Sequence, residues 1–196
     1  MSELFFQRPL KEKIMAKFIL SFLILIPTLS NAQVQSKVQS GLLLLDEQTR
    51  LPLETRYGKT LTFLKKSISA DLKDTTTLFT CALLLNAFNN VMARPASEVN
   101  AVTELKTALK MATRARELKM TEPKLIVLLA WINKNLCYQL LIEPKYNLKN
   151  VQLKERAAAF NTYKINGNKY LDIASLLYPE QAYDFETLKI KETYRN

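Results

Sequence analysis

The chain has 196 residues, of which 28 are lysine or arginine and 18 are aspartate or glutamate, so its net charge is +10 at pH 7. It contains no histidine and only two cysteines, which excludes Ser-His-Asp and Cys-His catalysis, histidine- or thiolate-ligated zinc and iron–sulfur clusters. With only three glycines, it also lacks the glycine-rich phosphate loop of Walker and dinucleotide-binding motifs. We therefore expect no cofactor, metal or catalytic residue set, although carboxylate, lysine or tyrosine chemistry stays open.

The N-terminal segment has the layout of a secretory signal peptide. Lys17 precedes the apolar run Phe18–Ile26, and small residues follow up to Ala32. We predict that residues 1–32 are a signal peptide cleaved after Ala32, with Met15 as an alternative start. A membrane anchor is the competing interpretation, but the apolar run is shorter than the roughly 20 residues that a span needs. The mature protein is then periplasmic or secreted and has no stable membrane span.

Residues 33–196 are predicted to form a single domain. Cleavage would remove four basic and two acidic residues from the total of +10, which leaves a net charge of +8 on 164 residues. A surplus of this sign attracts anionic polymers and acidic proteins. The alternative is that the charge only keeps the protein soluble.

The two cysteines, Cys81 and Cys137, both follow the predicted cleavage site. An even number of cysteines in an exported protein favours one disulfide. Each cysteine also lies in an apolar helical pattern, where a buried free thiol is the alternative. We expect a Cys81–Cys137 disulfide.

The first elements of the domain are predicted as helices. Val34–Thr49 is interpreted as an amphipathic helix that contains four successive leucines and is interrupted by Gly41. From Pro52 to Lys73, apolar residues recur every three or four positions, as on one face of a helix. Pro52 suits the first turn of that helix, since its missing N–H has no partner there in any case.

The middle of the domain should contain its most buried helices. One helix is expected to begin after Asp74 or Thr75 and to run to Met92. Ser97 is expected to cap the next. The segment Lys124–Ile142 contains eight consecutive apolar residues and keeps its periodicity beyond them, which predicts the central core helix.

The last part is predicted as three shorter helices. Leu148–Tyr163 is expected to be helical and to end at a turn formed by Asn-Gly-Asn at 166–168. Helices at Tyr170–Leu177 and Glu180–Tyr194 should follow. The predicted fold class is therefore all-α, a single compact bundle of about six to eight helices after the signal peptide.

Two surfaces are candidates for binding. Lys106, Lys110 and Arg114 recur every four residues on the side of their predicted helix away from its apolar face, which suits phosphates or an acidic partner. The alternative is an ordinary solvated face.

The second candidate is a predicted exposed tip at 164–169, formed around the turn at 166–168, with Tyr163, Lys164, Lys169 and Tyr170 at its ends. Tyrosine is favoured at protein interfaces because it is large and rigid and carries a polar hydroxyl. The alternative is that these tyrosines only cover the core while their hydroxyls reach water.

Three functions remain, in this order of preference. The first is an exported, non-catalytic protein that binds another protein, as an inhibitor, immunity factor or chaperone-like adaptor does. The second is a basic binder of anionic envelope polymers or nucleic acid. The third is a histidine-free cell-wall hydrolase that would need two converging carboxylates. Nothing in the sequence indicates an oligomeric state.

Overall fold

The computed structural model describes residues 34–45, 53–70, 73–90, 101–142 and 148–194. It is mostly helical, with one small two-stranded sheet, which confirms the helical fold class in its coarse form. All of the helices and strands described belong to one compact unit, Ser36–Asn196. The predicted signal peptide at 1–32 lies outside the described residues, and the expected bundle size stays a prediction.

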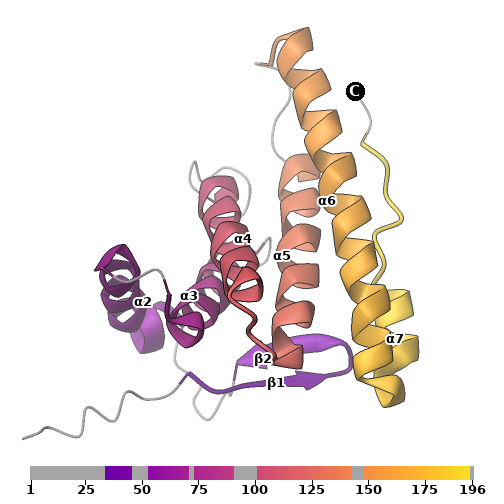
Figure 1. Cartoon of the computed structure of the whole chain (residues 1–196). Helices are drawn as coiled ribbons and strands as arrows, with labels where there is room; N and C mark the ends of the chain where they lie inside the picture. Colours follow the sequence, from indigo (N-terminus) through magenta and orange to yellow (C-terminus); the bar gives the residue numbers. More distant parts are fainter. Residues whose placement is uncertain (1–33, 46–52, 71–72, 91–100, 143–147, 195–196) are drawn as a thin grey trace, which may run out of the picture. The chain divides into compact units, whose positions relative to one another are not determined.

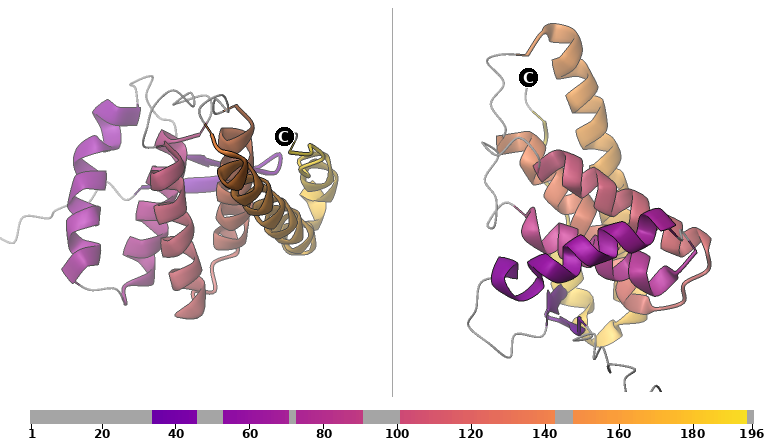
Figure 2. Two further views of the ribbon diagram at one scale, coloured as in Figure 1. Left: turned by 90° about the horizontal axis from the view of Figure 1, so that it is seen from above. Right: turned by 90° about the vertical axis from the view of Figure 1, so that its left-hand side faces the viewer.

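Each described helix packs against the one that follows it in the chain (Figure 1). The elements are β1 (Ser36–Gln39), β2 (Leu42–Leu45), α2 (Leu53–Ala70), α3 (Thr75–Phe88), α4 (Ala101–Glu117), α5 (Pro123–Ile142), α6 (Asn150–Leu177), the 3-10 turn η1 (Pro179–Gln181) and α7 (Ala182–Thr187). α5 is central, because it contacts α3, α4, α6 and both strands. α6 is the longest helix and extends past the end of α5 (Figure 2).

The helices predicted in the middle of the chain are confirmed as elements, but the first of them ends at Phe88 instead of continuing to Met92, since Asn89 and Asn90 are not helical. Asp74 caps α3: its Oδ1 accepts a hydrogen bond from the backbone N–H of Thr76 at 3.0 Å. A second hydrogen bond, from the Thr77 hydroxyl, is the main cause that lowers the pKa of Asp74. The predicted cap at Ser97 lies outside the described residues.

α5 is the core helix that its composition predicts. Among the described helices it alone is long and apolar enough to cross a membrane, but 72% of its most apolar window is buried inside the protein. The core helix of a globular domain has the same length and composition. Burial of α5 by its neighbours is therefore enough to explain its length and apolar composition.

The helix predicted at 34–49 is wrong over its described part, which forms an antiparallel hairpin instead. Ser40 and Gly41 connect the strands, with φ of 52° and 71°. Two successive residues of positive φ form a type I′ turn, whose twist matches that of paired strands. The register runs from Gln39↔Leu42 to Ser36↔Leu45.

Contacts of Gly41 hold the hairpin against the helices. Its carbonyl accepts a hydrogen bond from Trp131 Nε1 in α5 at 3.0 Å, and its N–H donates to Gln181 Oε1 in η1 at 3.0 Å. A Cβ at this position would lie 2.6 Å from Leu188 Cδ1. Glycine is therefore required here by the backbone angle and by the space available.

The turn predicted at 166–168 is also wrong, because α6 is one continuous helix through it. Gly167 is buried where α6 crosses α5, and a Cβ there would lie 3.3 Å from Asn133 Cβ and 3.0 Å from Ile190 Cδ1. The glycine therefore allows close packing rather than a turn. The predicted exposed tip at 164–169 is not present.

The helix predicted at 180–194 is only partly formed, because the chain leaves α7 at Leu188 and continues without regular structure to Tyr194. Side chains of α6 hold this segment. Asn168 Oδ1 accepts from the N–H of Ile190 at 2.8 Å, and Asn168 Nδ2 donates to the Ile190 carbonyl at 3.1 Å. Lys164 Nζ donates to the next two carbonyls along the segment. Ile190 is 1% exposed and belongs to the core.

The predicted disulfide is wrong, because Cys81 and Cys137 are both free, buried and not close to each other. Cys137 Sγ lies 3.5 Å from the Phe160 carbonyl oxygen in α6. Burial is the main cause that raises the pKa of Cys81 to about 11 and that of Cys137 to about 12. The two thiols are therefore protonated at neutral pH and behave as small core side chains.

Candidate functional site

A pocket of about 560 Å³ lies where the hairpin, the start of α2, α3 and α5 meet. This volume falls within the roughly 300–1,000 Å³ typical of ligand sites. The described residues that line it are Leu42, Leu43, Leu44, Leu45, Leu53, Leu83, Asn86, Ala87, Asn90, Trp131, Asn135 and Tyr138. The lining is apolar except for three asparagines, one tyrosine hydroxyl and the indole N–H.

The pocket follows the edge of β2. Successive side chains of a strand point to opposite faces of its sheet, yet all four residues of β2 line the pocket. A pocket above one face of the sheet would contact only every second residue of β2. A pocket that contacts all four residues therefore lies beside the strand, along its edge. Among the described residues, no strand pairs with β2 on the side away from β1.

The part of the lining that comes from α3 and α5 carries a pair of amides. Asn135 Nδ2, from α5, donates a hydrogen bond to Asn86 Oδ1, from α3, at 2.9 Å. Within the part of the chain that the structure describes, Asn86 Nδ2 and Asn135 Oδ1 take no part in this or any other hydrogen bond. The pair therefore offers both a donor nitrogen and an acceptor oxygen to a molecule in the pocket.

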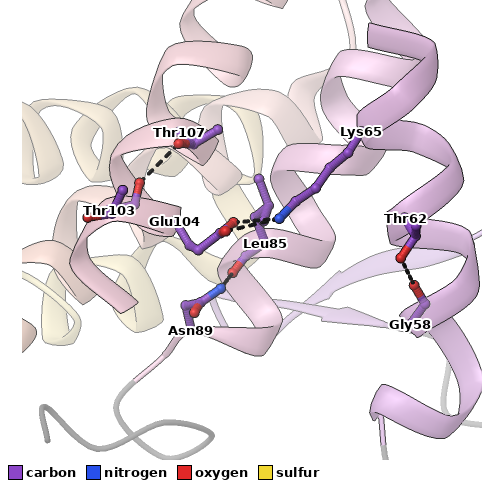
Figure 3. Close-up of polar contacts among 8 residues, drawn as sticks. All are labelled: Gly58, Thr62, Lys65, Leu85, Asn89, Thr103, Glu104 and Thr107. Atoms are coloured by element: carbon purple, nitrogen blue, oxygen red, sulfur yellow. Dashed lines mark hydrogen bonds and ion pairs between the residues drawn. The ribbon is translucent and has the colours of Figure 1, made fainter. Parts of the chain in front are cut away.

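A further amide joins α5 to the C-terminal end of α3, where a second amide caps the helix. Gln139 Nε2 in α5 donates to the backbone carbonyl of Asn89 at 3.0 Å. Asn89 Nδ2 in turn donates to the Leu85 carbonyl at 2.8 Å (Figure 3). Buried polar groups with such partners make a helix–helix contact geometrically specific. The two amide-bearing helices are thus held at a defined spacing.

Lys134 orders the aromatic side chains of the same lining. It is 8% exposed, and its Nζ donates to the Leu188 carbonyl at 2.6 Å. The same nitrogen lies 5.3 Å from the ring centroid of Trp131 and 5.6 Å from that of Tyr138. Burial lowers the pKa of Lys134 and raises the pKa of Tyr138, and the charge of Glu192 raises both.

The lining offers apolar surface and uncharged hydrogen-bonding groups. No group of three acidic or cysteine side chains that could hold a metal ion occurs in the described ranges. The described lining has no ionisable group except Tyr138, whose phenol is neutral at pH 7 even at its ordinary pKa of about 10, which burial raises further. An uncharged, largely apolar ligand with a few hydrogen-bonding groups matches this chemistry.

The predicted basic face is present on α4. Lys106, Lys110 and Arg114 are all exposed, and Arg114 Nη1 pairs with Glu117 Oε2 at 3.1 Å. On the neighbouring α2, Lys65 Nζ bonds Glu104 of α4 at 2.9 and 3.0 Å and links the two helices (Figure 3). A role of this face in binding stays a prediction.

The predicted tyrosine and lysine set is spread along α6 rather than around a tip. Tyr163 packs against the core near Cys137, and burial raises its pKa. Lys164 bonds the C-terminal segment, and Tyr170 OH accepts from Arg116 Nη1 at 2.9 Å. Lys169 is exposed. Three of the four thus have structural contacts, and their role in binding also stays a prediction.

The pocket was not predicted, because its strand was interpreted as part of a helix. Two features of the sequence favoured a hairpin. Valine or serine at 34, 36 and 38 alternates with long polar residues at 35, 37 and 39, which is the period of a strand. The Ser-Gly dipeptide at 40–41 is a turn signal.

Comparison of the chain with protein-family models, with curated protein sequences and with solved structures found no match. The geometry itself defines a helical protein with a neutral, apolar pocket beside a short hairpin. Its function is therefore argued from that pocket.

Proposed function

We propose that this is an exported, non-catalytic protein that binds another protein in the periplasm or outside the cell, as an inhibitor, immunity factor or chaperone-like adaptor does. The observation that supports this proposal is the apolar pocket beside β2. In protein interfaces, a few large side chains buried in such pockets carry most of the binding energy. Full burial of one leucine or phenylalanine side chain contributes about 1.5–3 kcal/mol.

A protein partner fits the pocket better than a small charged metabolite. Its described walls provide no charged side chain to neutralise a phosphate or carboxylate. They provide apolar surface, side-chain amides and the backbone of a strand. These are the groups that recognise peptide side chains and peptide bonds.

The test places a photo-crosslinking residue in the pocket. A benzoylphenylalanine at position 87, in the pocket lining, is compared with one at Thr113 on the exposed face of α4. Both proteins are incubated with envelope extract of the source cells at low and at high salt. We expect position 87 to yield a defined protein adduct at both salt concentrations, and Thr113 to yield none.

A pair of matched variants links the adduct to the pocket. Ala87→Trp fills the pocket, whereas Ala158→Trp adds the same side chain at an exposed position of α6. Partner capture through an affinity tag should be lost in the first variant and kept in the second. Capture that is equal in both, with no adduct from position 87, would contradict the proposal.

A second candidate function is the binding of anionic envelope polymers or nucleic acid. On α2, Phe63 is 60% exposed and lies between the exposed Lys59 and Lys66. An apolar side chain flanked by cations is typical of surfaces that bind anionic lipids or polymers. Binding of polyphosphate or anionic vesicles that weakens steeply with salt would support this candidate. The third hypothesis, a cell-wall hydrolase, has no support in the described pocket lining, which contains no carboxylate.

A further inference from the structure

We propose that the pocket binds its partner as an extended segment that adds to β2 as a third strand, with the amides of Asn86 and Asn135 contacting the other edge of the segment. This inference rests on the proposed function and names the form of the partner: an uncharged, extended stretch of polypeptide with apolar side chains. Three independent observations support it.

The first observation is the orientation of the backbone of β2. In a hairpin with a two-residue turn, the residues next to the turn exchange both hydrogen bonds, and pairing then alternates along the strand. The register Gln39↔Leu42 and Lys37↔Leu44 therefore directs the backbone groups of Leu42 and Leu44 toward β1. The N–H and C=O groups of Leu43 and Leu45 point to the other edge, where an added strand would pair.

The second observation is the position of the pocket along that same edge. The pocket that β2 lines has a volume of about 560 Å³, and Leu83 and Ala87 of α3 also line it. Four residues of strand span about 14 Å at roughly 3.4 Å each. A segment of four or five residues therefore matches the length of the edge, and its side chains would enter the apolar space.

The third observation is the amide pair that lines the same pocket as β2. A peptide group in an extended segment offers one N–H donor and one C=O acceptor. After its own hydrogen bond of 2.9 Å, the Asn86–Asn135 pair retains a donor nitrogen, Asn86 Nδ2, and an acceptor oxygen, Asn135 Oδ1, that take part in no hydrogen bond. The pair is therefore complementary to a single residue of an extended backbone.

The same protein already holds an extended segment in this way. Asn168 bonds both the N–H and the C=O of Ile190, at 2.8 and 3.1 Å, while the Ile190 side chain is buried beneath it. The side-chain amide of Asn168 thus makes the two hydrogen bonds to Ile190 that a neighbouring strand would otherwise make. The pocket offers the corresponding groups from two asparagines, together with the residues of β2.

The experiment uses a pool of synthetic peptides as the probe. The peptides are acetylated, amidated hexamers in which threonine alternates with valine, isoleucine, leucine or phenylalanine. Binding to the purified protein is followed by hydrogen exchange and by NMR. We expect the amide protons of Leu43 and Leu45 to gain protection, while those of Leu42 and Leu44, already paired with β1, do not change.

Two matched controls test the backbone contacts. Peptides with N-methyl groups at alternate residues keep the side chains but lose the donors of one edge, so binding should weaken about tenfold or more. The double variant Asn86→Leu/Asn135→Leu removes both amides together and leaves no buried partner unpaired. It should weaken binding of the unmethylated pool to a similar degree, whereas Asn161→Leu, at an exposed position of α6, should not.

The outcomes separate this inference from the proposed function. If N-methylation has no effect, or if no peptide of the pool protects Leu43 and Leu45, strand addition is wrong. A crosslinked partner at position 87 would in that case still support protein binding through the pocket. If the double variant unfolds, the N-methylated peptides alone decide the question.

Discussion

The conformation of Gly41 leads to a sharp prediction about the hairpin. Replacement by alanine places a Cβ 2.6 Å from Leu188 Cδ1 and 3.3 Å from Asp184 Cβ, at a φ of 71°. The left-handed conformation costs a non-glycine residue about 1–2 kcal/mol. Overpacking of a filled site costs about 1–3 kcal/mol more. Gly41→Ala should therefore lower the free energy of unfolding by about 2–5 kcal/mol, since both terms act together.

Urea unfolding followed by far-UV circular dichroism and by tryptophan fluorescence measures this effect. The chain has one tryptophan, Trp131, whose indole N–H donates to the Gly41 carbonyl. Its emission in the folded state should therefore also change. Gly58→Ala is the matched control, because a Cβ there has no atom within 4 Å and the site is helical. That variant should gain about 0.5–1 kcal/mol.

Equal stability of Gly41→Ala and the wild type would refute this reasoning. It would mean that the turn adopts another conformation in solution, or that Leu188 moves away without cost. The hairpin would then not be held as described, and the strand edge that borders the pocket would lose its structural basis.

Three further predictions concern the core. Burial raises the pKa of Cys81 from 9.0 to about 11 and that of Cys137 from 9.0 to about 12. The unfolded chain therefore loses these protons first, and the free energy of unfolding should fall as pH rises above 9. The loss should be about 1.4 kcal/mol per thiol at about pH 10. A Cys81→Ala/Cys137→Ala variant should show a flatter pH profile, and an unchanged slope would reject this cause. Both thiols should react with a thiol reagent only after unfolding; a native protein without free thiols would contradict the structure. Ile190→Ala should lower the free energy of unfolding by about 2–5 kcal/mol, and Asn168→Leu should lower it by about 1–3 kcal/mol. Urea unfolding measures both. A loss below about 0.5 kcal/mol in each variant would show that the C-terminal segment contributes little to stability.

The central helices could be predicted because their signals are local. Asp74 before an apolar run predicts the start of α3, and the structure shows that cap. The periodicity from Lys124 to Ile142 is long enough to exclude a strand, and α5 covers the same range. Patterns of this length determine element type wherever the surrounding structure agrees with them.

The hairpin and the continuous α6 could not be predicted in the same way. Four successive leucines carry no period, so only pairing with residues 36–39 and packing on α5 decide that they form a strand. The Asn-Gly-Asn sequence at 166–168 favours a turn locally. Close contact of Gly167 with α5 and with Ile190 stabilises the helix instead, since burial in the core outweighs a weak local preference.

The sequence by itself determined the helical class, the basic charge and the absence of histidine, because these follow from composition and from local periodicity. Only the tertiary structure decided the pocket, because its lining comes from β2, the start of α2, α3 and α5, and Leu42 and Tyr138 are 96 residues apart in the chain. No local pattern specifies which faces of such distant elements meet. For the same reason only the structure showed that Cys81 and Cys137 pack in separate parts of the core.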